Sequence, residues 1–290
     1  MPDRTVWMHI YSFILEFYVN MRGIYLHNLR ILCIIRAYTN EEDTLMKKIL
    51  ALICAFCMIL GCAAFADTLT MGTNAAFPPY EYYEDGVIVG IDAEIAAAIC
   101  EKLGYDLEIL DMDFNGLIAA VASGKIDFAM AGMTKTPERE QNVNFSITYA
   151  TGVQSIIVPE NSPITCLDDL YAEGASYKIG VQQGTTGDIY CTDDFGADAV
   201  SQFLTGADAV AALVAGKLDC VIIDNNPAKA FVDANEGLKL LDTDYSEEEY
   251  AIAIALENTE LLEKVNAALE ELIEDGTIAG IIAKYIPVEE

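Results

Sequence analysis

The chain has 290 residues, 53% of them hydrophobic, and its 46 Asp and Glu outnumber its 16 Lys and Arg to give a net charge of −30. So acidic a surface repels nucleic acid and anionic lipid, which excludes both as charge-driven partners. Both histidines, His9 and His27, precede Met46, so the chain beyond it lacks the commonest general base and metal ligand. We therefore expect a binding protein without metal or cofactor.

Residues 46–66 have the order of a secretory signal peptide. A basic start at Met46 leads into a short apolar run and then into Ala64-Phe65-Ala66, and the run is too short for a membrane span. Ile59-Leu60-Gly61-Cys62 is a competing cleavage site at which Cys62 would carry a lipid. We favour the lipid anchor slightly over a free secreted form.

Residues 1–45 do not fit in front of a signal peptide. Four arginines and interrupted apolar stretches make neither a clean membrane span nor an amphipathic helix. We interpret residues 1–45 as lying upstream of the true start at Met46, with no domain of their own. The alternative is a membrane-associated leader.

From residue 67 the pattern alternates between strands and helices. Residues 69–72, 87–91 and 107–110 predict strands, and Asp92 is expected to cap a helix that ends near Leu103. Two prolines keep the loop after Phe77 extended. Because Phe77 and Phe114 both follow strand ends, we expect them at the ligand edge of a sheet, with core packing as the alternative.

One pattern occurs twice, at residues 117–132 and 209–224. Each copy is an apolar helix, then Gly-Lys, then a short apolar strand. A helix that leads directly into a buried strand is half of a βαβ unit, so two copies predict two α/β lobes with parallel strands. At the strand ends, where ligands lie, one copy has Ala131-Gly132 and the other has Asp224.

Arg139 is a candidate binding residue. Thr136 and Pro137 are expected to begin a helix, which places Arg139 in its first turn, where a cation opposes the helix dipole. A carboxylate bound bidentately by the guanidinium would compensate for that position. The alternative is an exposed arginine paired with Glu138 or Glu140.

Two further features suggest binding in the second half of the chain. Residues 180–188 predict a strand, a tight glycine turn and a helix start, whose N–H groups suit a phosphate or a carboxylate. Asp224 ends an apolar strand, where it either binds a ligand or caps the next helix.

Four cysteines follow the signal region. They allow three pairings if they form two disulfides, and the sequence does not choose among these. We expect one bridge at most, from Cys166 to Cys191, and we expect Cys220 to be a small hydrophobe in a core strand. The four are Cys100, Cys166, Cys191 and Cys220.

Five short blocks follow one another in a specific order. They are Gly72-Thr73-Asn74-Ala75-Ala76-Phe77-Pro78-Pro79-Tyr80, Gly90-Ile91-Asp92, Met112-Asp113-Phe114, Ala131-Gly132-Met133-Thr134 and Thr136-Pro137-Glu138-Arg139. Taken in order, these blocks resemble family 3 of the extracellular solute-binding proteins, the polar amino-acid-binding proteins of ABC importers. The resemblance runs through essentially all of residues 67–290.

The resemblance implies an α/β, two-lobed periplasmic-binding-protein-like fold of type II, with two parallel-rich mixed sheets joined by a two-strand hinge. Lobe 1 would comprise residues 67–150 plus 251–290, and lobe 2 residues 151–250. The crossing strands would lie at 149–153 and 247–250.

It also implies an extracytoplasmic, monomeric protein that binds a free L-amino acid, polar or basic, and delivers it to the membrane subunits of an ABC permease. The ligand carboxylate would be held by Arg139, Thr134, Thr185 and the backbone near Gly132. Asp224 would bind the ligand ammonium, and Phe77 and Phe114 would sandwich its side chain. Asn74 stands where several relatives have an acid. The full expected site comprises Asn74, Phe77, Phe114, Ala131, Gly132, Thr134, Arg139, Gln182, Thr185, Thr186 and Asp224.

Two other functions use the same fold. One is a dehydratase-type periplasmic enzyme, whose chemistry would depend on carboxylates alone because histidine is absent beyond residue 46. The other is a ligand-sensing module that reports occupancy to a receptor.

Overall fold

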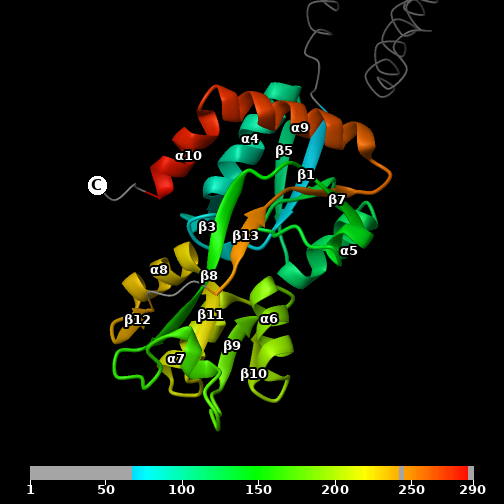
Figure 1. The fold of residues 1–290 in the computed structure, drawn as a ribbon. Helices are drawn as coiled ribbons and strands as arrows, with labels where there is room; N and C mark the ends of the chain where they lie inside the picture. Colours follow the sequence, from blue (N-terminus) through cyan, green and yellow to red (C-terminus); the bar gives the residue numbers. More distant parts are fainter. Residues whose placement is uncertain (1–66, 242–244, 287–290) are drawn as a thin grey trace, which may run out of the picture. The chain divides into compact units, whose positions relative to one another are not determined.

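The computed structural model describes residues 67–241 and 245–286, which belong to one unit, 66–290. The proposed signal segment 46–66, Cys62 and residues 1–45 lie outside the described residues. Strands and helices alternate along most of the described chain and build three sheets (Figure 1). No described helix is both long and apolar enough to cross a membrane.

The first sheet has the strand order β5-β1-β6-β14-β7 and mixes directions. β1 runs parallel to β5 and β6, whereas β14 runs antiparallel to β6 and β7. α4, α9 and α10 pack together beside it, and α5 contacts β6 and β14. These elements are β1 (Thr68–Thr73), α4 (Ile91–Leu103), β5 (Asp106–Asp111), α5 (Leu117–Ala122), β6 (Phe128–Ala129), β7 (Val143–Phe145), β14 (Ala253–Ala255), α9 (Thr259–Glu274) and α10 (Thr277–Tyr285).

The second sheet has the order β10-β9-β11-β8-β12. β9 lies parallel to β10 and β11, while β8 is antiparallel to β11 and β12. β11 is buried along its whole length, as an apolar run between two neighbouring strands should be. The elements are β8 (Ala150–Pro159), β9 (Ile179–Gln182), α6 (Thr186–Phe195), β10 (Val200–Phe203), α7 (Gly206–Val214), β11 (Cys220–Asp224), α8 (Asn225–Ala234) and β12 (Leu238–Leu240).

Two strands carry the chain between these sheets. β8 follows β7 into the second sheet, and β13 (Glu247–Tyr250) returns the chain to β14. The two pair antiparallel, with Glu247 opposite Val153 and Tyr250 opposite Ala150 (Figure 1). The sequence prediction of two crossing strands at these positions is confirmed.

The third sheet is a small antiparallel one in which β3 lies between β2 and β4. Phe77 of β2 pairs with Glu81 of β3. The sheet follows directly after β1, so it lies next to the end of a central strand. Its strands are β2 (Ala76–Phe77), β3 (Glu81–Glu84) and β4 (Val87–Val89).

Both copies of the repeated pattern form the predicted helix-to-strand unit. In the first copy α5 leads into β6, which is parallel to β1, and in the second α7 leads into β11, which is parallel to β9. The chain thus builds two mixed sheets, each with a parallel core.

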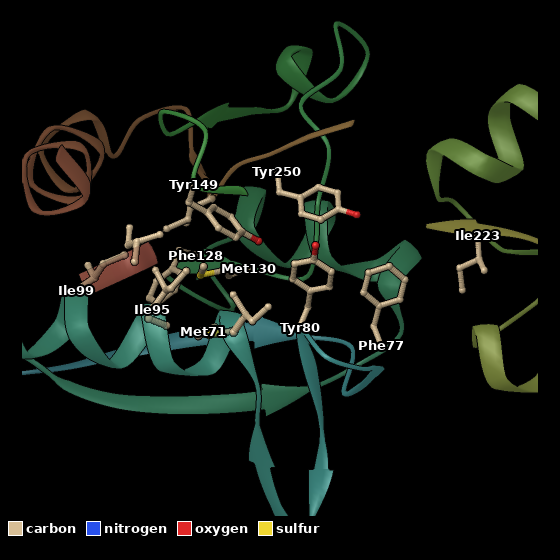
Figure 2. Packing of buried hydrophobic residues seen from close by; sticks show 14 of the residues in the cluster. Met71, Phe77, Tyr80, Ile95, Ile99, Phe128, Met130, Tyr149, Ile223 and Tyr250 are labelled. Carbon is tan, nitrogen blue, oxygen red and sulfur yellow. The ribbon is translucent and has the colours of Figure 1, made fainter. Parts of the chain in front are cut away.

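The largest hydrophobic cluster joins α4, the middle of the first sheet and the neighbourhood of β11. Figure 2 shows Ile95 and Ile99 of α4 beside Phe128, with Tyr80 and Tyr250 further along toward Ile223. Each fully buried aliphatic side chain contributes about 1.5–3 kcal/mol to folding. The tyrosines bring hydroxyl groups to the edge of this cluster.

The expectation that Asp92 caps α4 is wrong. The N-cap residue is Gly90, and no side chain caps the helix there. Asp92 lies one position inside the helix and is fully buried, where its Oδ2 accepts hydrogen bonds from Gly132 N–H and the Tyr149 hydroxyl. The carboxylate therefore ties α4 to two other segments.

The helix expected to begin at Thr136 and Pro137 is only a short 3₁₀ turn, Arg139–Gln141. Thr136 still accepts a hydrogen bond from the Arg139 N–H, at 3.3 Å. Because the segment forms only a single 3₁₀ turn, Arg139 does not oppose the dipole of a longer helix, as the sequence analysis expected.

The expected Cys166–Cys191 bridge is also wrong, because all four cysteines of the described chain are free thiols. Cys191 is buried in the core beside β9 and β11. Cys166 instead occupies the N-cap position of the 3₁₀ helix Leu167–Leu170, where its N–H donates to Asp169 Oδ2 at 3.2 Å. Cys166 and Cys191 thus lie in different elements. Cys220 is a buried core residue, as predicted.

Candidate functional site

A pocket lies where strands of both large sheets end. All eleven expected site residues line it, together with Glu81, which the sequence analysis did not single out. The lining residues are Asn74, Phe77, Glu81, Phe114, Ala131, Gly132, Thr134, Arg139, Gln182, Thr185, Thr186 and Asp224.

Arg139 is a buried cation without a carboxylate partner among the described residues. Its Nη1 donates to the Thr134 carbonyl at 2.5 Å and its Nη2 to the Gly184 carbonyl at 3.0 Å. Glu140 pairs with Lys135 instead, at 3.1 Å, so the alternative of an exposed Arg139 paired with a neighbouring glutamate is wrong. Burial lowers the pKa of Arg139, yet a guanidinium stays protonated.

Asp224 is a buried acid at the end of β11. Its Oδ1 accepts a hydrogen bond from the Tyr250 hydroxyl and its Oδ2 one from Gln154 Nε2 at 3.0 Å. It occupies the N-cap position of α8 but makes no side-chain cap, so capping does not explain this acid. Burial raises the pKa of Asp224 to about 7, and nearby Glu248 adds to the rise. A cation bound here would restore the charged form.

The turn before α6 uses several of its polar groups internally. Gly184 N–H donates to Asp188 Oδ2 at 2.9 Å, and the Thr185 hydroxyl donates to the Gln182 carbonyl at 2.8 Å. The Thr186 hydroxyl accepts from Gln154 Nε2 at 3.4 Å. For an anion in the cavity, Arg139 is therefore a stronger partner than this turn.

A direct hydrogen bond crosses the cavity. Gln182 Nε2, at the end of β9, donates to Asn74 Oδ1, just after β1, at 2.9 Å. Asn74 Nδ2 in turn donates to the Met112 carbonyl at 2.9 Å. Gly132 lines the cavity, but its N–H points at Asp92 rather than at a ligand.

The two expected aromatic residues are both buried and both line the cavity, so each also belongs to a hydrophobic cluster. Phe77 stacks on Tyr80 with ring centroids 5.9 Å apart (Figure 2). The Arg139 guanidinium lies over the Phe114 ring, with its Cζ atom 5.4 Å from the ring centroid. Core packing and cavity lining are thus compatible for these rings.

Glu81 is the site residue that the sequence reading missed. It is 1% exposed, and neither of its carboxylate oxygens accepts a hydrogen bond from an N–H or hydroxyl group of the described chain. Its strand reads Glu-Tyr-Tyr-Glu, which does not mark one face as buried. Only the pairing of Glu81 with Phe77 brings it to the cavity.

Residues 69–288 match the sequence profile of the bacterial extracellular solute-binding proteins, family 3. The chain belongs to this family. It is 33% identical to the arginine-binding extracellular protein ArtP of Bacillus subtilis (strain 168) over 257 residues, which cover 84% of this chain and 100% of ArtP.

Two solved structures are similar as well. An ancestral arginine-binding protein bound to arginine is 40% identical with a TM-score of 0.71, covering 77% of this chain and 99% of that one. The arginine-, lysine-, histidine-binding protein ArtJ from Geobacillus stearothermophilus is 32% identical with a TM-score of 0.72, covering 77% and 97%. The predicted family and α/β fold are confirmed. As a member of this family, the chain is an extracytoplasmic solute-binding protein rather than an enzyme.

Proposed function

We infer that this solute-binding protein captures a cationic L-amino acid, arginine first, and delivers it to the membrane subunits of an ABC permease. Glu81 carries the inference, because it is a buried acid in the cavity wall without a donor from the described chain. A guanidinium presents a planar fork of N–H donors that a carboxylate accepts bidentately. The relatives named as arginine-binding proteins support the same ligand.

The headgroup of the ligand would bind between two opposite charges. Arg139 and Asp224 both line the cavity, and neither forms an ion pair with another of the described residues. The α-carboxylate would pair with Arg139 and the α-ammonium with Asp224. The side chain would then extend between Phe77 and Phe114 toward Glu81.

Lobe 1, residues 67–150 plus 251–290, would contribute Arg139 and Glu81, and lobe 2, residues 151–250, would contribute Asp224. Closure of the two lobes around the amino acid would follow from this division, because only the closed form completes the site.

The test compares arginine with citrulline, its neutral isostere, by calorimetric titration. We expect arginine to bind at least about 30-fold more tightly, because losing a buried charge pair costs roughly 2–5 kcal/mol. In Glu81→Gln the difference in affinity between arginine and citrulline should disappear. The matched control is Glu84→Gln, an exposed acid on the same strand, which should keep it. Equal affinities for the two ligands in the unaltered protein would overturn the cationic assignment.

We further propose that residues 46–66 direct export, that Cys62 carries a lipid, and that the mature protein is a monomer. The intact mass of the exported protein separates a lipid on Cys62 from a free terminus at Asp67. A mass that includes residues 1–45 would contradict the proposed start at Met46.

A further inference from the structure

Behind the cavity, Glu81 lies against a second buried acid. The Asp92 N–H donates to the carbonyl of Tyr80, the residue before Glu81, at 2.9 Å, so the two acids are neighbours. The Asp92 carboxyl group is 0% exposed, and it raises the pKa of Glu81 both as a charge and as a hydrogen-bond partner. Neither Glu81 oxygen, nor Asp92 Oδ1, has an N–H or hydroxyl donor within the described chain. Two carboxyl groups in contact satisfy each other only when one proton lies between them.

The two acids are held unequally. Asp92 Oδ2 accepts from Gly132 N–H at 2.8 Å and from the Tyr149 hydroxyl at 2.9 Å, so its negative charge is stabilised in place. Glu81 has no such donors among the residues that the structure describes, and it is the member of the pair that reaches the cavity. A shared proton therefore belongs on Glu81, with Asp92 as the acceptor.

The other charged and titratable groups around the pair favour retention of that proton. Tyr80 and Tyr149 lie beside it, and Asp224 adds a further negative charge from β11. No lysine or arginine forms an ion pair with either acid within the described residues. Burial and the neighbouring Asp92 hold the pKa of Glu81 well above its ordinary value, and burial raises the pKa of Asp92 to about 6.

We propose that Glu81 and Asp92 share one proton until a cationic side chain binds at Glu81 and displaces that proton to solvent. The inference rests on the proposed function, since it requires a cationic ligand at Glu81. Asp92 is then a positioning residue, which acts on the ligand through Glu81. On binding, the O–H bond of Glu81 breaks, its proton leaves, and the N–H groups of the cation take its place at the carboxylate.

This exchange makes arginine binding depend on pH. While Glu81 is protonated in the unbound protein, each cation bound releases one proton, so affinity rises with pH by up to tenfold per unit. Citrulline carries no charge at the same position and leaves the proton on Glu81. Both ligands share the headgroup, so titration of Asp224 and Glu248 contributes equally to both and cancels in the comparison.

The experiment is calorimetric titration of both ligands at pH 5.5–8 in buffers of different ionisation enthalpy, which counts the protons released. At the acidic end, arginine should release about one proton more than citrulline. Asp92→Asn should remove most of this difference while retaining the preference for arginine, because an asparagine amide donates to Glu81 and keeps it ionised. The control Asp111→Asn, which alters an acid that accepts from Ala75 N–H, should behave like the unaltered protein.

The outcomes separate this inference from the proposed function. Suppose that arginine is preferred and that Glu81→Gln abolishes the preference, but that both ligands release the same number of protons at every pH. The proposal of a shared proton is then wrong, and the proposal of a cationic ligand stands. If arginine and citrulline bind alike, the proposed function fails first. Should Asp92→Asn not fold, the proton count in the unaltered protein alone decides.

Discussion

Arg139 and Asp224 are buried charges that the described chain leaves without an opposite partner. Arg139 donates hydrogen bonds to two carbonyl groups, and Asp224 accepts hydrogen bonds from Tyr250 and Gln154. These bonds fix the direction of each side chain but do not neutralise its charge. Burying such groups destabilises the ligand-free protein. A bound zwitterionic ligand supplies an opposite charge to each of them and so offsets this cost. Binding affinity and fold stability therefore oppose each other at these residues.

Replacing Asp224 by Asn should stabilise the ligand-free protein near neutral pH. The folded-state pKa of about 7 exceeds the ordinary value, so the folded protein loses stability as pH rises from about 4 to 7 and the acid is forced to ionise. Asp224→Asn should not show this loss, and Gln154 can turn its unpartnered Oε1 toward the new amide. The difference in unfolding free energy between Asp224→Asn and the unaltered protein should reach a few kcal/mol at pH 7–8 and vanish near pH 4.

Urea unfolding at several pH values measures this gap. Asp233→Asn is the control, since Asp233 lies in an exposed pair with Lys229 and should show no pH-dependent difference. The same Asp224→Asn protein should bind arginine at least tenfold more weakly, because the ligand ammonium loses its charged partner. A variant that is no more stable at pH 8 than the unaltered protein would contradict the account.

At the scale of elements, α4 positions residues that lie in or beside the cavity. It carries Asp92, which holds Gly132 and Tyr149, and its first turn packs under Tyr80. The helix begins at Gly90, whose φ of 127° and close contact with the Tyr80 carbonyl leave no room for a side chain. Its other end, Gly104, is also left-handed but open to solvent.

These two glycines make a matched pair. In Gly90→Ala the added Cβ would lie 2.2 Å from the Tyr80 carbonyl oxygen, so we expect a loss of several kcal/mol in unfolding free energy and weaker arginine binding. In Gly104→Ala nothing lies within 4 Å of the Cβ, and the cost should be about 1–2 kcal/mol for the left-handed backbone alone, with binding unchanged. Equal losses in urea unfolding would mean that the Tyr80 contact does not matter.

At the scale of the whole described molecule, the two large sheets meet through hydrogen bonds from opposite sides of the cavity. Gln182 bonds to Asn74 at 2.9 Å, Arg139 to the Gly184 carbonyl at 3.0 Å, and Asn226 to the Tyr80 hydroxyl at 3.0 Å. Only β8 and β13 carry the chain between these sheets within the described residues (Figure 1). A few such bonds and two strands permit a hinge motion that a ligand can bias.

We expect arginine to reduce the radius of gyration measured by small-angle scattering. Agmatine, which lacks the carboxylate, and N-acetylarginine, which lacks the ammonium, should each cause little compaction, since each leaves Arg139 or Asp224 unpaired. The guanidinium is present in all three, so the comparison isolates the headgroup. Equal compaction by the two analogues would show that side-chain contacts at Phe77 and Phe114 drive closure instead.

Local sequence signals determined much of the fold. The repeated helix-Gly-Lys-strand pattern predicted both parallel cores because its apolar period and its strand ends depend on neighbours close in the chain. The ordered blocks and the second-half patterns together brought out eleven residues that line one cavity, seven of them within the blocks. Their individual roles toward a ligand stay predictions.

Only the tertiary structure decided how the acids are used. Asp92 looked like a helix cap because a cap is a local property, yet its partners lie 40 and 57 residues away in the chain. Glu81 has no local mark of burial, and it reaches the cavity because β3 pairs with β2. Whether a carboxyl group is solvated, paired or shares a proton depends on burial and on distant neighbours, which the order of residues alone does not specify.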